Sequence, residues 1–235
     1  MKALILAAGF GSRLAPMTDD IPKALVPVNG KPILLKQLEN LYDCGVTDIT
    51  VISGYRANML EAAVHDRFRD VNVVKNPDFE TTNNMYSALL GREAVAGDDF
   101  LMMNGDVFMD SAVIKALLED EHPNAIVTDI GFYLPESMKV VETDGRLTHI
   151  AKDIPADAAL GASIDVYRFS QEAGSAFFDK CAEYIERGEK NLWSEVALDG
   201  ILAEHAFHAC PLEGRWYEID NPDDLAAAER IFDDE

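Results

Sequence analysis

Residues 6–14 read Leu6-Ala7-Ala8-Gly9-Phe10-Gly11-Ser12-Arg13-Leu14, and Pro22-Lys23-Ala24-Leu25 follows shortly afterwards. Residues 3–7 form a continuous apolar run, which is typical of a strand that is buried on both faces. A strand that ends in a loop with two glycines lets backbone N–H groups approach phosphate oxygens, because no Cβ atom obstructs them. Arg13 and Lys23 add two cations suited to the outer phosphates of a nucleoside triphosphate. The stretch therefore predicts a phosphate-binding loop after the first strand.

Two better-known glycine motifs are excluded here. A dinucleotide-binding fingerprint needs a third glycine where Leu14 stands, and a Walker A loop needs a Gly-Lys-Ser/Thr sequence, which does not follow. The acidic residue that a nicotinamide-dependent dehydrogenase places downstream of its glycines is also missing from the usual distance. A dehydrogenase is therefore a disfavoured alternative.

Strand and helix patterns alternate through the first half of the chain. A helix is expected between Pro32 and Gly45, with Leu34, Leu38 and Leu41 on one face. The other expected elements are strands at 48–53, 71–74, 100–104 and 125–130, and helices at 58–68, 85–95 and 111–118. This βαβα order predicts a doubly wound, mostly parallel sheet with its ligands at the carboxyl ends of the strands.

The pattern changes after residue 130. Short strands are expected at 139–142, 147–151 and 164–169, with Asp144-Gly145 as a hairpin turn between the first two. Helices at 170–187 and from about Ser194 precede a strand at 216–219, and Asn221-Pro222 begins a last helix with an N-cap and an N1 proline. We predict a single domain over 1–235, with a nucleotide-binding half at 1–130 and an acceptor-binding half at 131–235.

The charge is strongly negative overall but not at the amino end. Twenty Lys plus Arg against 42 Asp plus Glu give a net charge of −22, whereas residues 1–36 carry five cations and two anions. The global charge disfavours nucleic-acid and anionic-membrane partners, and the local excess indicates a small anionic ligand. Three cysteines at unrelated spacings, and no apolar run near the roughly 20 residues of a membrane span, indicate a cytoplasmic protein with reduced thiols.

Two acidic positions are candidates for Mg²⁺. Asp106 follows Asn104-Gly105 at the end of an apolar strand that is expected to lie parallel to the first, so its carboxylate faces the same crevice. Asp220 precedes the last helix. Mg²⁺ takes one or two carboxylates together with phosphate oxygens, so these two side chains are expected to converge on one ion. Asp110 is interpreted as the cap of the next helix.

In these motifs the chain resembles the nucleoside-triphosphate transferases that activate sugar phosphates and small phospho-alcohols. The resemblance implies an α/β/α sandwich of the nucleotide-diphospho-sugar transferase type, with a Rossmann-like mixed sheet. It places Leu6, Ala7, Ala8 and Gly9 at the nucleotide base, Gly11, Ser12 and Arg13 around the triphosphate, and Lys23 on the phosphates. It also assigns the metal to Asp106 and Asp220.

A finer resemblance rests on Asn83-Asn84-Met85-Tyr86-Ser87, the lysine of Ile150-Ala151-Lys152-Asp153-Ile154, and Glu218-Ile219-Asp220. Together these are similar to the cytidylyltransferases for phosphocholine and for phosphonates such as 2-aminoethylphosphonate. The likeness implies that Ser87, with Asn84, reads the cytosine edge. It also implies that Lys152 and Lys139 bind the phosphate or phosphonate of the acceptor.

The acceptor's head group is expected to be an amine. Trp193 and Glu195 fall where the phosphocholine enzymes place an aromatic residue and a carboxylate, a combination suited to an ammonium ion. Ser137 and Met138, however, stand where those enzymes carry a further aromatic residue. That departure favours a primary amine or a phosphonate, and Asp129 and Asp165 are further candidates for holding it.

The expected reaction is Mg²⁺-dependent transfer of CMP from CTP to a small phosphate or phosphonate, with release of pyrophosphate. Arg13, Lys23 and Lys152 are the expected catalytic cations. A UTP- or dTTP-dependent sugar-1-phosphate transferase and a non-catalytic nucleotide-sensing module remain as alternatives. His205, His208 and Cys210 have no second ligand pair and are interpreted as packing residues rather than a zinc site. The oligomeric state is open, a homodimer included.

Overall fold

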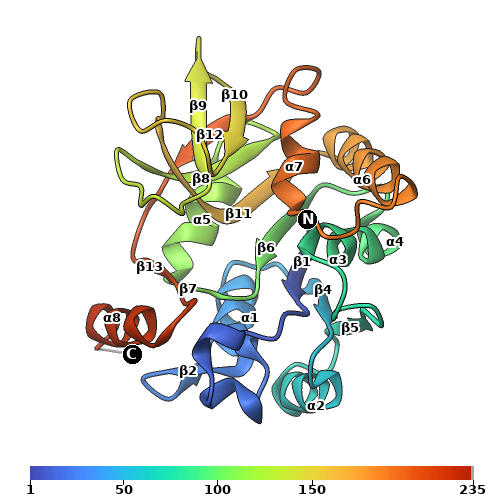
Figure 1. Ribbon diagram of the computed structural model, residues 1–235, viewed down its shortest axis with the longest axis vertical. Helices are drawn as coiled ribbons and strands as arrows, with labels where there is room; N and C mark the ends of the chain where they lie inside the picture. The colour runs from blue at the N-terminus through green and yellow to red at the C-terminus, as the bar shows by residue number, and fades with distance from the viewer. Residues whose placement is uncertain (234–235) are drawn as a thin grey trace.

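The computed structural model describes residues 1–233. A mixed central sheet has the strand order β10-β9-β11-β6-β1-β4-β5, with β8 beside β11 and β12 beside β8, and helices flank it (Figure 1). Its strands are β1 (Lys2–Ala7), β4 (Asp48–Ser53), β5 (Asn72–Lys75), β6 (Phe100–Asn104), β8 (Ala125–Ile130), β9 (Lys139–Thr143), β10 (Arg146–Ala151), β11 (Gly161–Phe169) and β12 (His208–Pro211). The predicted α/β sandwich is confirmed; the division into two functional halves stays a prediction.

The helices are α1 (Ile33–Asp43), α2 (Ala57–Arg67), α3 (Asn84–Leu90), α4 (Arg92–Val95), α5 (Ser111–Glu119), α6 (Gln171–Glu186), α7 (Ser194–Asp199) and α8 (Pro222–Ile231). Short pieces complete the chain: 3₁₀ helices at Ser12–Leu14, Met17–Asp19 and Lys23–Leu25, and the strand pair β2 (Pro27–Val28) and β3 (Lys31–Pro32). Within residues 1–233, no helix combines the length and the apolar character that a membrane span requires.

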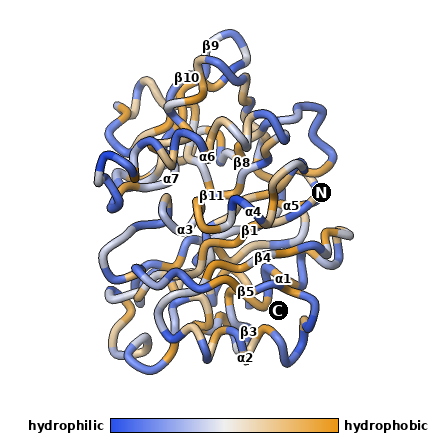
Figure 2. The backbone as a smooth tube through the Cα atoms, turned by 90° about the vertical axis from the view of Figure 1, so that its right-hand side faces the viewer, coloured by the Kyte–Doolittle hydropathy of each residue, from blue (hydrophilic) through white to orange (hydrophobic). Residues whose placement is uncertain are grey.

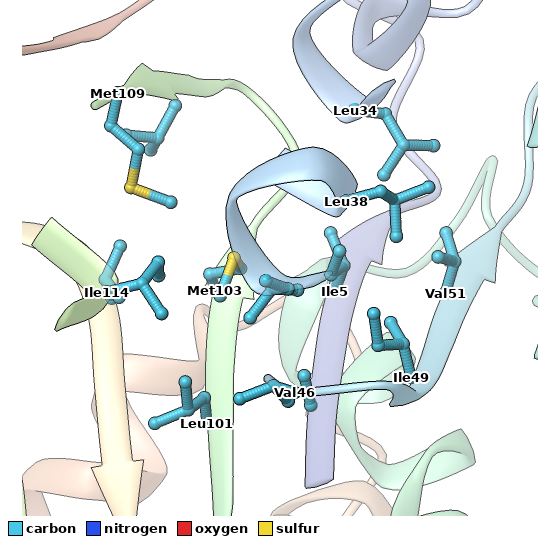
Figure 3. Packing of buried hydrophobic residues seen from close by; sticks show 14 of the residues in the cluster. Ile5, Leu34, Leu38, Val46, Ile49, Val51, Leu101, Met103, Met109 and Ile114 are labelled. Carbon is cyan, nitrogen blue, oxygen red and sulfur yellow. The ribbon is translucent and has the colours of Figure 1, made fainter. Parts of the chain in front are cut away.

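The parallel part of the sheet is β6-β1-β4-β5. Ile5 pairs in register with Val51 on one side and with Met103 on the other. Leu34 and Leu38 of α1 lie over these strands, where they are fully buried (Figure 3). Because parallel strands run in one direction, the segments that follow β1 and β6 leave the sheet at the same edge, which is where the site described below is built.

The opposite face carries a second apolar layer. Leu4 and Phe100 contribute to a cluster with residues of α3, α6 and α7, and the hydrophobic stretches of Figure 2 follow these central strands. Gly91 packs so closely on Leu4 that a Cβ there would lie 2.4 Å from Leu4 Cδ1. At this glycine the helix expected over 85–95 divides into α3 and α4.

The other part of the sheet is largely antiparallel. β11 pairs antiparallel with β6 and with β8, and β9 and β10 form the predicted hairpin. Asp144 and Gly145 both have positive φ, at 52° and 76°, as a type I′ turn requires. β12 was not predicted, because its short sequence mixes polar and apolar residues. It forms a strand by pairing parallel with β8.

A small two-stranded ribbon joins the middle of the chain to its C-terminal part. β7 (Val107–Met109), which was not predicted, pairs antiparallel with β13 (Trp216–Glu218), and α8 lies next to them (Figure 1). The side chain of Asn221 accepts hydrogen bonds from the N–H groups of Asp223 and Asp224 and Pro222 is at N1, so the predicted start of the last helix is confirmed. The ribbon sets residues 218–220 beside Asp106.

Candidate active site

One cavity of about 310 Å³ lies at the carboxyl ends of β1 and β6. It contains predicted residues from both halves of the chain. These are Leu6, Ala8, Gly9, Gly11, Ser12, Arg13, Lys23, Asn84, Ser87, Asp106, Lys152, Asp165, Trp193, Glu195 and Asp220. The structure therefore brings fifteen of the eighteen predicted site residues to one place.

The loop after β1 is shaped by Gly11. Its φ is +67°, a value that L side chains rarely adopt, and a Cβ at this position would lie 2.7 Å from Cβ of Lys23. The Gly11 carbonyl oxygen accepts a hydrogen bond from the Thr18 hydroxyl at 2.8 Å. The glycine thus lets the segment that carries Lys23 pack directly on the loop after β1.

Lys23 joins the loop to the two predicted metal ligands. Its Nζ lies 2.7 Å from Asp106 Oδ2 and 2.6 Å from Asp220 Oδ1, and Arg13 Nη2 lies 2.8 Å from Asp220 Oδ2. Burial by itself would lower the pKa of Lys23, but the charges of the two carboxylates outweigh it and raise that pKa above its ordinary value. Burial would likewise raise the pKa of Asp220, yet the lysine and Arg13 hold it below its ordinary value. Both shifts favour the charged forms of Lys23 and Asp220 at neutral pH.

A third carboxylate, Glu218, completes an acidic group. One oxygen each from Asp106, Glu218 and Asp220 lies within 4.8 Å of the others, and among residues 1–233 no other group of three potential ligands converges in this way. Burial, then repulsion by Asp106 and Asp220, raise the pKa of Glu218 to about 7. Asp106 Oδ1 is buried and has no hydrogen-bond partner among the described residues. Hard carboxylate oxygens with one oxygen left unpaired fit a Mg²⁺ ion.

The wall that the resemblance assigns to the nucleotide base contains Asn84 and Ser87. The Asn84 side chain accepts a hydrogen bond from Ser194 N at 2.8 Å and donates one to Asn104 Oδ1 at 3.3 Å, so its amide ties α3 to α7 and β6. Ser87 is 3% exposed and accepts a hydrogen bond from Asn76 Nδ2 at 3.1 Å. Neither Asn76 nor its neighbour Thr82 was among the predicted residues.

The opposite end of the cavity carries one cation and several acids. Lys152 Nζ lies 4.5 Å from the centre of the Trp193 ring. Glu195 is 2% exposed, and its Oε1 accepts hydrogen bonds from the Tyr167 and Ser194 hydroxyls at 2.7 and 3.0 Å. Burial, followed by the charges of Glu195 and Glu218, raises the pKa of Asp165 well above its ordinary value.

Three predicted residues lie outside the cavity. Ala7 is buried beneath it, against Gly105. Asp129 accepts a hydrogen bond from Trp216 Nε1 at 3.0 Å, so it holds a wall residue rather than facing the acceptor. Lys139 is 4% exposed, and its Nζ donates to the carbonyl oxygens of Pro135, Ser137 and Lys152. The structure therefore does not place these three residues in the cavity lining.

Two smaller expectations also have outcomes. Asp110 occupies the N-cap position of α5 but makes no capping bond, because both of its carboxylate oxygens accept hydrogen bonds from Arg215. The interpretation of His208 as a packing residue is supported by its ring, which stacks on His122 with the centroids 3.7 Å apart.

Some wall residues escaped sequence reasoning for identifiable reasons. Glu218 was quoted in a motif but not chosen as a ligand, although its spacing of two from Asp220 puts both on one face of an extended segment. Asn76, Phe79 and Thr82 come from a turn after β5 that carries no recognisable motif, and only the tertiary fold places them in the cavity.

The family of MobA-like NTP transferase domains matches residues 3–132, which is more than half of the chain. The chain belongs to this family. The matched region of this NTP transferase domain contains the phosphate loop, Lys23 and Asp106, whereas Glu218 and Asp220 lie beyond it. The predicted resemblance to nucleotidyltransferases is confirmed.

Relatives of this NTP transferase differ in what their names say they make. The chain is 29% identical over 244 residues to the CMP-5'-(3-aminopropyl)phosphonate synthase of Streptomyces rubellomurinus, an alignment that covers 99% of this chain and 39% of that protein. It is 28% identical over 243 residues to the UTP–glucose-1-phosphate uridylyltransferase AglF of Haloferax volcanii, with coverage of 100% and 98%. The chain thus spans well under half of the first relative and nearly all of the second.

A solved structure supports the fold over the whole length. The CTP:phosphocholine cytidylyltransferase of Streptococcus pneumoniae superposes with a TM-score of 0.80 at 26% identity, and the match covers 98% of both chains. The C-terminal part of this NTP transferase, beyond the region that the family match covers, therefore also follows a known nucleotidyltransferase.

Proposed function

We propose that this chain is a Mg²⁺-dependent cytidylyltransferase, which transfers CMP from CTP to a small phosphate or phosphonate that carries an amine. The observation that carries the proposal is the bridge from Lys23 to Asp106 and Asp220 at 2.7 and 2.6 Å, at the foot of the glycine loop. Cations and carboxylates that meet in one cavity suit a triphosphate with its metal ion.

The bond changes need no acid or base from the protein. An oxygen of the acceptor's phosphate or phosphonate attacks the α-phosphorus of CTP, a new P–O bond forms, and the bond to the β-phosphate oxygen breaks with its electron pair leaving on pyrophosphate. The attacking oxygen is already anionic near neutral pH, so no proton has to be removed. Catalysis then rests on position and on charge neutralisation.

Each side chain has a task in that scheme. Arg13 and Lys23 hold the triphosphate, and Lys152 draws the acceptor's anionic group toward it. Asp106, Glu218 and Asp220 would hold Mg²⁺, which supplies charge neutralisation at the phosphates when it is bound. We infer that the acceptor's amine faces Asp165 and Glu195, since both acids line the same cavity as Lys152.

The nucleotide and the acceptor can be tested together. The protein is incubated with Mg²⁺ and CTP, UTP or dTTP, each with phosphocholine, 2-aminoethylphosphonate or glucose 1-phosphate, and the products are weighed by mass spectrometry. A CMP adduct of the amine-bearing acceptors, with loss of turnover in EDTA, is the expected result. Absence of any CMP adduct would contradict the proposal.

Uridylyl transfer to a hexose 1-phosphate is the second candidate. It is favoured by the alignment with the Haloferax volcanii uridylyltransferase, which covers nearly the full length of both proteins. A UMP adduct of glucose 1-phosphate in the same experiment would establish it.

A further inference from the structure

A hydrogen-bond network with two buried members lies at the cavity wall formed by the turn after β5 and the start of α3. Its members are Asn76, Asp78, Thr82 and Ser87, and Asn76 and Ser87 are 1% and 3% exposed. The turn after β5, which carries Phe79, packs close to the end of β1 with Gly54 between them. A Cβ on Gly54 would lie 2.5 Å from the Ala8 carbonyl oxygen and 2.7 Å from Phe79 Cβ. The network therefore lies against the end of β1, beside the phosphate loop.

The orientation of the Asn76 amide is dictated by a backbone group. Its Oδ1 accepts the N–H of Asp78 at 2.9 Å, and a backbone N–H can only donate. The amide oxygen must therefore face Asp78, and the NH₂ group must face the hydroxyls. Nδ2 indeed lies 3.1 Å from both Thr82 Oγ1 and Ser87 Oγ.

The hydroxyls of Thr82 and Ser87 differ in whether another residue accepts their hydrogen. Thr82 uses its hydrogen on the Asp78 carbonyl oxygen, at 2.9 Å. Ser87 accepts from Asn76, and no residue among 1–233 accepts its hydroxyl hydrogen. Because Ser87 is buried and lines the cavity, that hydrogen is available to a bound ligand.

We propose that Asn76 is a specificity-determining positioning residue, which fixes Ser87 as a hydrogen-bond donor and thereby selects cytosine over uracil. Ring atom N3 of cytosine is an acceptor and pairs with a donated hydroxyl. In uracil N3 carries a hydrogen, and the Ser87 oxygen could accept it only by turning its own hydrogen to a buried direction with no acceptor among residues 1–233, which disfavours uracil. This inference rests on the proposed function and adds to it the residue pair that chooses the nucleotide.

The decisive variant is Asn76→Asp. A carboxylate of nearly the same shape still accepts the N–H of Asp78, but its other oxygen accepts the Ser87 hydroxyl and reverses that group's direction. The measurement is kcat/KM for CTP and for UTP under identical conditions, together with binding of both nucleotides by calorimetry. We expect the CTP-to-UTP ratio to fall about tenfold or more. The ratio cancels the general effect of an added negative charge on triphosphate binding.

Three further variants locate the effect at Ser87. Ser87→Ala should lower the ratio, and adding Asn76→Asp to Ser87→Ala should not change it further, because the group to be reversed is gone. Thr81→Val is the matched control: Thr81 lies in the same turn but is exposed and outside the cavity lining, and its hydroxyl donates to the Asp78 carbonyl oxygen, so the ratio should stay at the parent value.

Equal losses for CTP and UTP in Asn76→Asp, or an unchanged ratio, would overturn the inference. If Asn76→Asp does not fold, Asn76→Ala carries the same test, since it frees the Ser87 hydroxyl to rotate and should lower the ratio; an unaltered ratio there is equally decisive. Failure of the proposed function is a separate result, because then the parent protein itself makes no CMP adduct.

Discussion

Ile219 donates its backbone N–H to the carbonyl oxygen of Asp106 over 3.0 Å. This contact extends the β7–β13 ribbon by one residue. Glu218 and Asp220 are the neighbours of Ile219 in the chain, so the contact brings both of their carboxylates close to the carboxylate of Asp106. Because main-chain atoms make the contact, a substitution of the Asp106 side chain leaves it intact, although it removes one of the two ion-pair partners of Lys23.

Asp106→Ala is expected to lower turnover by roughly 10² to 10³-fold, as the loss of a charged contact to a reacting group does. Pyrophosphate release measures the rate, and thermal unfolding shows that the fold persists. Asp70→Ala, at an exposed position, is the matched control and should behave like the parent. Parent-like activity in a folded Asp106→Ala protein would remove this carboxylate from the mechanism.

Gly11→Ala and Gly9→Ala separate the effect of backbone strain on stability from the effect of a blocked cavity on triphosphate binding. At Gly11 the φ of +67° and the nearby Lys23 Cβ oppose a methyl group, so we expect a loss of about 1–3 kcal/mol in unfolding free energy. Gly9 has no heavy atom within 4 Å of an added Cβ, so its alanine variant should keep its stability. Because Gly9 lines the cavity, KM for the triphosphate should still rise. Urea unfolding and steady-state kinetics check both; equal stability of the two variants would contradict the role given to Gly11.

Asp165→Asn should make the ligand-free protein more stable at alkaline pH. The pKa of Asp165 is raised in the folded state, so folding favours its protonated form, and its contribution to stability is lost as pH rises above the ordinary value of 3.8. The φ of +60° is one that asparagine tolerates. Urea unfolding at about pH 4 and about pH 8 should show near-equal stability at the lower pH and a gain for the variant at the higher. A variant that is less stable than the parent at the higher pH would contradict the raised pKa of Asp165.

The same variant should lose acceptor affinity. If an ammonium group pairs with Asp165, its removal raises KM for 2-aminoethylphosphonate about tenfold or more while KM for CTP stays close to the parent value. An unchanged acceptor KM would place the amine elsewhere.

Lys152→Met should impair catalysis and leave stability nearly unchanged, whereas Lys139→Met should impair stability. Lys152 lies at the cavity over Trp193, so its loss should lower kcat/KM for the acceptor by roughly 10²-fold with little change in stability. Lys139 is buried on three carbonyl oxygens, which its substitution would leave unpaired, so we expect a loss of about 2 kcal/mol or more in unfolding free energy. Unfolding curves and acceptor kinetics of the two variants distinguish these roles, and similar profiles would contradict them.

The site could be predicted from the sequence where one short segment carries several of its parts. Gly11, Arg13 and Lys23 lie close together in the chain, and strand direction indicated that Asp106 would face them, whereas Asp220 was assigned to the same site by the family resemblance and its place before the last helix. Asn221-Pro222 marked the start of α8 through local capping chemistry. These are features of backbone geometry that neighbouring residues specify.

Features that depend on which way a side chain points could not be predicted. Lys139 and Lys152 both border the β9–β10 hairpin, and only the packing of residues 134–138 buries one and leaves the other at the cavity. Asp129 was expected at the acceptor, but it bonds to an indole that comes from a distant strand. β7 and β12 are short, and each exists because a remote partner strand supplies its hydrogen bonds.

The β7–β13 ribbon also bears on how the protein is made. During synthesis the glycine loop, Lys23 and Asp106 leave the ribosome long before Glu218 and Asp220 do. Until then Lys23 has one of its two carboxylate partners and the acidic group lacks two of its three members. A nascent chain that stops short of β13 therefore lacks part of the candidate site, which is completed only when this strand, the last among residues 1–233, has been made.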